Sequence, residues 1–131
     1  MTSKLREEFE PLLISPFGLH VNGQLCRERW ETDPGELQQF ERAMEWLSLC
    51  SRTKHINEAA GSSYGLKHTA ERWYRERGRS TYISNGHLIM AAHRLGFLMK
   101  GLNGRYCFPG VGYRSDICNV YLNLSKKVHD G

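Results

Sequence analysis

The sequence lacks a long hydrophobic run, and its first twenty residues do not predict a secretory leader. Its longest uninterrupted apolar stretch is residues 88–92, whereas a membrane-spanning helix needs about 20 apolar residues. The first twenty residues contain Glu7, Glu8 and Glu10 and no apolar segment of the kind that a signal peptide carries. These absences predict a cytoplasmic protein that does not enter the membrane.

Motifs of common catalytic and metal sites are also missing. The chain contains no GxSxG, GxxxxGK[ST], GxGxxG, HExxH or CxxC. The scattered Cys26, Cys50, Cys107 and Cys118 favour free thiols in a reducing compartment, with pairing of Cys107 and Cys118 left open. Cys50 near His55 could form a nucleophile pair, but Cys50 falls on the apolar side of a predicted helix. We therefore expect no enzyme activity, no metal and no cofactor.

Charge is unevenly distributed along the chain. Residues 1–60 carry seven Lys or Arg and ten Asp or Glu, whereas residues 61–131 carry eleven and four. Such asymmetry favours a basic face that contacts phosphates or an acidic protein surface. The structural alternative is a solvated helix with an i,i+4 ladder of Lys67, Glu71 and Arg75. The densest run of cations is Lys67, Arg72, Arg75, Arg77 and Arg79.

The length of 131 residues fits one domain. We expect an irregular segment at 1–32, a helical part at 33–96, a β-rich part at 97–124 and a frayed tail at 125–131. The apolar spacing predicts helices over 34–51, 63–76 and 85–95. Asp33 is the expected N-cap of the first helix, Ser84 or Asn85 that of the third, and Gly96 its left-handed C-terminal residue.

The β-rich part predicts a hairpin of 97–100 with 105–108 and a third strand over 117–124. Helices followed by an antiparallel sheet define an α+β fold. Three helices and a hairpin are also the element order of a winged-helix domain, in which Lys100 and Arg105 on the wing would meet phosphates. The third helix has a core-like composition, so the second helix, over 63–76, is the better candidate for groove or phosphate contact.

Aromatic residues interleave with these cations. Arginines beside exposed aromatic rings can bind single strands through charge and base stacking. Most of the rings are predicted to be core, including Trp73, which is in register with Leu66 and Ala70. Only Tyr74 and Tyr113 are expected to be exposed.

Two segments carry a resemblance. Residues 62–68 (SSYGLKH) with Glu71, and 82–86 (YISNG) with Ala91-Ala92 and Gly96-Phe97, resemble small accessory proteins of bacteriophages, plasmids and integrative elements. The closing segment 119–123 (NVYLN) is similar as well. The resemblance implies a bacterial or phage setting and an accessory role, and it brings no catalytic residue.

Two functional hypotheses follow. The first is a nucleic-acid-binding accessory or regulatory protein of a mobile element, with duplex DNA as the expected partner. The second is a protein-binding inhibitor of host defence, of the anti-CRISPR or anti-restriction type, that occupies an acidic surface of a host protein. A structural protein of a phage particle is a third option, and Trp30 and Trp46 suggest a homodimer through the helix at 34–51. The expected binding residues are Lys67, His68, Arg72, Arg75, Arg77, Arg79, Lys100 and Arg105.

Overall fold

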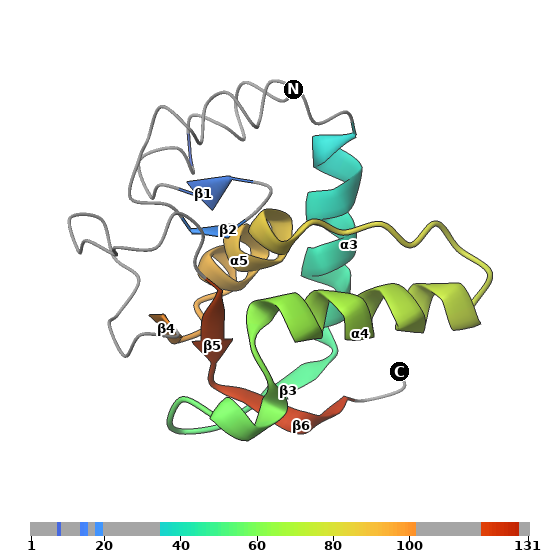
Figure 1. The fold of residues 1–131 in the computed structure, drawn as a ribbon. Helices are drawn as coiled ribbons and strands as arrows, with labels where there is room; N and C mark the ends of the chain where they lie inside the picture. Colours follow the sequence, from blue (N-terminus) through green and yellow to red (C-terminus); the bar gives the residue numbers. More distant parts are fainter. Residues whose placement is uncertain (1–7, 9–13, 16–17, 20–34, 102–118, 129–131) are drawn as a thin grey trace.

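The protein has an α+β fold (Figure 1), as the sequence predicts. The computed structural model describes residues 8, 14–15, 18–19, 35–101 and 119–128. In chain order the elements are β1 (Ile14–Ser15), β2 (Gly18–Leu19), α3 (Glu36–Ser48), β3 (Cys50–Arg52), the 3-10 helix η2 (Glu58–Ala60), α4 (Ser63–Glu76), α5 (Asn85–Arg94), β4 (Met99–Gly101), β5 (Val120–Leu122) and β6 (Leu124–Val128).

Helix α5 is the centre of the core. It packs against α3, α4 and the small β1–β2 pair, and every residue from Asn85 to Ala92 is buried. Trp46 of α3, Ile89 of α5 and Leu122 of β5 are among its fully buried side chains. Burying one such side chain contributes about 1.5–3 kcal/mol, so α5, with eight consecutive buried residues, contributes substantially to the stability of the fold.

Two helices end in the same way. In α5, Gly96 adopts φ 83° and the Phe97 amide donates to the Ala92 carbonyl at 2.9 Å. After α4, Gly78 adopts φ 67° and the Arg79 amide donates to the Tyr74 carbonyl at 3.0 Å. Both are Schellman caps, in which glycine accepts a left-handed conformation that side chains disfavour. The predicted bounds of α4, and Gly96 as the terminator of α5, are therefore confirmed.

The N-terminus of α5 is capped by a side chain. Ser84 Oγ accepts the backbone N–H of His87 at 3.0 Å and lies 2.5 Å from His87 Nδ1. The hydroxyl can donate to this nitrogen while its oxygen accepts the amide, so both groups are satisfied. Of the two caps proposed from the sequence, Ser84 is the one used.

The strands form three separate antiparallel pairs: β1 with β2, β3 with β6, and β4 with β5. Asn123 lies between β5 and β6 and joins two of these pairs. Its side-chain amide donates to the Thr53 carbonyl at 3.0 Å, and its Oδ1 accepts the Leu98 amide at 2.8 Å. These bonds hold the bend that lets one segment pair first with β4 and then with β3.

Three predictions about element bounds are wrong. The first helix ends at Ser48 rather than 51, because Cys50–Arg52 instead pair with β6 as strand β3. The strand predicted over 117–124 is interrupted at Asn123, which bends the chain. Residues 125–128 are not frayed, since they belong to β6.

The predicted wing is only partly within the described residues. Met99–Gly101 form β4, whose described partner is β5. The second half of the predicted hairpin, 105–108, lies outside the described residues, as do Cys107 and Cys118. The prediction of Asp33 as the N-cap of the first helix is wrong, because α3 begins at Glu36 with Gly35 as its N-cap residue.

Candidate functional site

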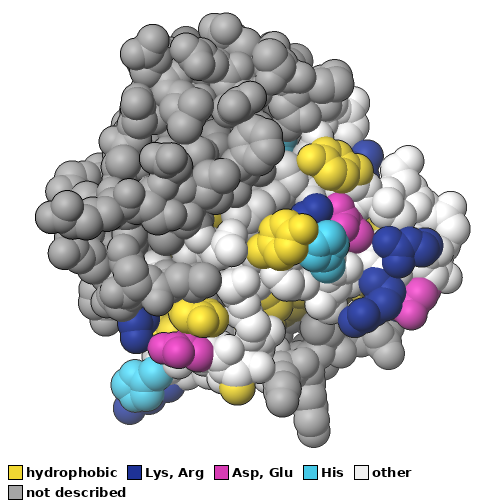
Figure 2. Space-filling view, viewed as in Figure 1, with side chains coloured by type: hydrophobic (Ala, Val, Ile, Leu, Met, Phe, Trp, Pro, Cys, Tyr) yellow, Lys and Arg dark blue, Asp and Glu magenta, His cyan; other side chains and the backbone are white. Residues whose placement is uncertain are grey.

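Helix α4 divides into a buried side and an exposed side. Leu66, Ala70 and Tyr74 recur every four residues and enter the core. The exposed side carries Tyr64, His68, Arg72 and Arg75, which follow at spacings of four, four and three. Residues at these spacings lie along one face of a helix. We call these four residues the α4 stripe, and Figure 2 shows hydrophobic, histidine and cationic side chains gathered on this side of the molecule, with acidic side chains among them.

Arg72 and Arg75 are the two cations of the α4 stripe. Both are exposed, and neither forms an ion pair or hydrogen bond with any residue in the described part of the chain. They lie three residues apart, so the two guanidinium groups can reach neighbouring charges of one ligand. Among the described residues, no acid compensates the charge of these two predicted binding residues.

Other predicted binding residues are engaged within the protein. Arg79 pairs with Glu45 at 3.1 Å and lies over the Tyr74 ring. Hydrogen bonds from Tyr74 and then Arg79 hold the pKa of the Glu45 carboxyl below its usual range. Lys100 pairs with Glu58 at 3.1 Å. Both ion pairs are exposed and weak, but they direct these cations toward acids of the same chain.

Arg77 and Arg105 complete the predicted set. The Arg77 guanidinium packs on the Trp73 ring at 4.0 Å and donates to the Trp73 carbonyl at 3.0 Å. Trp73 is partly buried, and the Arg77 guanidinium covers part of its ring. Arg105 lies outside the described residues.

Lys67 was predicted to lie with the other cations on the exposed side of α4, but it is buried. Its side chain is 11% exposed, and its ammonium donates to Glu71 Oε2 at 3.2 Å. Glu71 also accepts the Ile83 amide at 3.0 Å and lies 3.1 Å from His68 Nδ1. The predicted Lys67–Glu71 ion pair is confirmed. The Glu71 carboxylate also connects α4 to the link at 77–84, because it accepts the Ile83 amide.

This cluster joins the two segments that carried the resemblance. Lys67, His68 and Glu71 belong to the first, and Ile83 belongs to the second. A third contact comes from the closing segment, where the Val120 amide donates to Ser63 Oγ at 3.0 Å. The residues that share the pattern thus lie together in space.

Two tyrosines flank the Lys67 ammonium. Tyr64 is 53% exposed and Tyr82 is 56% exposed, and their ring centroids lie 5.6 and 5.3 Å from Lys67 Nζ. Such distances permit cation–π attraction. Tyr64 also meets the His68 ring edge to face. These are exposed aromatic rings beside cations, as base stacking requires.

The prediction that Tyr74 is exposed is wrong. Tyr74 is fully buried, and its hydroxyl lies 2.5 Å from Glu45 Oε1 and 3.0 Å from the Arg42 carbonyl, both acceptors for its one proton. Burial, with the neighbouring Glu45 carboxylate, raises the pKa of the Tyr74 hydroxyl. Its spacing of four from Ala70 was the available signal. Tyr113 lies outside the described residues, and Tyr82 was assigned only to a connecting link.

Cys50 has no features of a nucleophile. Its thiol donates to the Trp46 carbonyl at 3.4 Å, and burial raises the pKa of the thiol to about 12. Across residues 35–101 and 119–128, no group of three His, Cys, Asp or Glu side chains could hold a metal ion. None of the helices described is long and apolar enough to cross a bilayer. Trp46, proposed to leave surface for a dimer, is fully buried.

Comparison with known proteins gives no family: no family model, no curated protein and no solved structure matches this chain.

Proposed function

We propose that this protein binds nucleic acid through the α4 stripe and serves as an accessory or regulatory protein of a mobile genetic element. The observation that carries the proposal is the pair Arg72 and Arg75, which are exposed and form no ion pair with the rest of the described chain. Phosphate contact is the interaction that unpaired surface arginines favour most in nucleic-acid binding. The mobile-element setting rests on the resemblance of residues 62–68 and 82–86.

The surroundings of these arginines support the proposal. His68 and Tyr64 continue the α4 stripe, and the nearby Glu71 carboxylate is already occupied by Lys67 and the Ile83 amide. Glu76 is the exposed acid at the C-terminal end of α4. Since Arg79 and Lys100 are paired with acids, fewer phosphates are contacted than the eight predicted residues would suggest, and binding depends on α4.

Duplex DNA is the partner that a single exposed helix suits best. An α-helix fits the major groove, where arginine can contact both phosphates and guanine edges. In this arrangement α4 takes the position that the third helix has in a winged-helix protein. Its stripe would lie along the groove, with Arg72 and Arg75 near the phosphates.

The direct test is charge reversal with a matched control. Arg72→Glu and Arg75→Glu, separately and together, are compared with Lys54→Glu, an exposed cation in the loop before η2. Fluorescence anisotropy with mixed-sequence duplex at ~50 mM salt should show about 10-fold weaker binding for each stripe variant. The Lys54→Glu protein should bind as the wild type does.

The same variants distinguish nucleic-acid binding from the alternative function, that of a protein-binding inhibitor. If wild-type protein does not bind DNA or RNA at this low salt, the nucleic-acid proposal is wrong. A host protein that is captured by the wild type, and is lost with the doubly reversed protein but not with Lys54→Glu, would then identify the α4 stripe as a protein-binding surface.

A further inference from the structure

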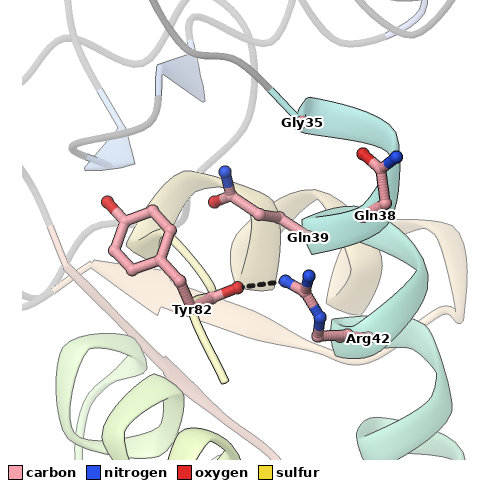
Figure 3. A pocket seen from close by; sticks show the side chains of 5 residues that line it. All are labelled: Gly35, Gln38, Gln39, Arg42 and Tyr82. Atoms are coloured by element: carbon pink, nitrogen blue, oxygen red, sulfur yellow. Dashed lines mark hydrogen bonds between the residues drawn. The ribbon is translucent and has the colours of Figure 1, made fainter. Parts of the chain in front are cut away.

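A pocket lies next to the α4 stripe, between α3 and the link at 77–84. Its volume is about 440 Å³, within the range of ligand pockets. Its described lining residues are Gly35, Gln38, Gln39 and Arg42 from the start of α3, together with Tyr82 from the link. Figure 3 shows Gln39 and Arg42 extending from α3 toward Tyr82, with Arg42 at the Tyr82 carbonyl, while Gln38 lies farther from the ring.

The segment that carries Tyr82 is held at three consecutive residues. Arg42 Nη1 donates to the Tyr82 carbonyl at 2.5 Å. Glu71 accepts the Ile83 amide at 3.0 Å, and Gln39 Oε1 accepts the Ser84 amide at 2.9 Å. Bonds from both α3 and α4 therefore fix the backbone on which the ring is mounted. An aromatic ring that is exposed yet held in place is a preorganised surface for stacking.

The chemistry of the lining matches a nucleobase. Tyr82 offers an aromatic face, and base–aromatic stacking tolerates every base. Gln38 is exposed, makes no hydrogen bond to the described residues, and carries a donor and an acceptor side by side. A glutamine amide pairs in this way with an adenine edge. Arg42 supplies positive charge, and the described lining contains no carboxylate.

We propose that this pocket binds a single unpaired nucleobase, stacked on Tyr82 with its edge toward Gln38. The inference rests on the proposed function and extends it, because it assigns to the protein a preference for nucleic acid with an unpaired base over a continuous duplex. Arg72 and Arg75 hold the backbone, while Tyr82 and Gln38 hold the base. A free nucleotide has the same base and phosphate chemistry as a base within a strand. The test below therefore distinguishes these two ligands.

The test places 2-aminopurine at one unpaired position of an oligonucleotide, since its fluorescence is quenched on stacking. Wild-type protein should quench the probe and bind this oligonucleotide more tightly than the matched continuous duplex. Tyr82→Ala should abolish the quenching and weaken binding of the unpaired-base oligonucleotide about 5- to 150-fold. Its affinity for continuous duplex should stay within about twofold, because Arg72 and Arg75 are unchanged.

Two variants control for loss of fold and for a general loss of exposed apolar surface. Tyr82→Phe keeps the ring and should keep the quenching. Leu98→Ala removes an apolar side chain of similar exposure that lies outside both the pocket and the α4 stripe, and it should also keep the quenching. Persistence of quenching in Tyr82→Ala, or its loss in Leu98→Ala, would overturn the proposal.

A second arm uses 2-aminopurine riboside monophosphate alone. Quenching of both probes, with mutual competition, would support a pocket that accepts free nucleotide as well. Quenching of the oligonucleotide only would support recognition of the base within a strand. Quenching of the free nucleotide without oligonucleotide binding would support a base-binding pocket but refute the proposed function. Oligonucleotide binding without quenching would refute the pocket and leave the proposed function standing.

Discussion

Helices α4 and α5 are consecutive in the chain but play opposite roles. In α5 the eight residues from Asn85 to Ala92 are all buried, so this helix is enclosed by the rest of the protein. In α4 only one side is buried, and the other carries the α4 stripe. The helix that a winged-helix arrangement would assign to DNA is therefore core, and the helix before it is the available surface.

The difference follows from how charge is placed on each helix. The cations of α4 are spread along its length, so one side must face water. Those of α5 are confined to its last turn, where His93 and Arg94 suit the negative end of the helix dipole. A helix with an apolar middle and a basic end can be enclosed, whereas one with a basic side cannot.

The largest effect should come from the core helix. Ile89→Ala removes a fully buried side chain and should lower the free energy of unfolding by about 2–5 kcal/mol. Urea denaturation followed by circular dichroism measures this loss. A loss below about 1 kcal/mol would contradict a central position for α5.

The next effect tests the buried contact between α4 and the link. Glu71→Ala leaves the Lys67 ammonium and the Ile83 amide without their acceptor, so a loss of about 2–4 kcal/mol is expected. Lys67→Met should cost less, because Glu71 keeps the Ile83 amide and its contact with His68. Urea denaturation should therefore give a lower midpoint for Glu71→Ala than for Lys67→Met. A larger loss of stability for Lys67→Met would refute the conclusion that Glu71 is the main contact between α4 and the link.

A third prediction concerns acid stability. Burial lowers the pKa of His87 from 6.5 to about 3, so the folded protein keeps this ring neutral where the unfolded chain protonates it. The contribution to stability is complete above the unfolded pKa and is lost as the pH falls toward 3, by up to about 1.4 kcal/mol per pH unit. Unfolding free energies at several pH values measure the slope.

The control for this prediction lies on the same helix. His87→Gln should flatten the acid dependence, whereas His93→Gln, which alters an exposed residue of α5, should retain it. If wild-type and His87→Gln proteins lose stability equally on acidification, other groups are responsible.

The smallest effect on stability should come from the α4 stripe. Arg72→Ala removes an exposed side chain without an ion pair to the described residues, and its unfolding free energy should stay within about 0.5 kcal/mol of the wild type. A larger loss would mean that Arg72 serves the fold rather than a ligand.

Much of the helical part was predictable from the sequence. Ser63–Glu76 and the caps at Ser84, Gly78 and Gly96 depend on local chemistry, which the sequence displays directly. The pairing of β3 with β6 was not predictable, because it joins residues more than seventy positions apart through short strands with little local signal.

The site was predictable in part. Arg72 and Arg75 follow from charge and helical spacing. The engagement of Arg79 by Glu45 and of Lys100 by Glu58 was not visible, because each ion pair joins residues that are distant in sequence. Tyr82 was missed for a similar reason: only the tertiary contacts of Arg42, Gln39 and Glu71 turn a link residue into a fixed, exposed ring.

The most direct test of the central claim is the salt dependence of binding. Anisotropy titrations from ~50 to ~200 mM salt give the slope of log affinity against log salt, which falls by about one for each phosphate contact removed. Arg72→Gln with Arg75→Gln should reduce the wild-type slope by about two, and Lys54→Gln should leave it unchanged. An unchanged slope in the double variant would contradict the account, because phosphate contact would then lie elsewhere on the protein.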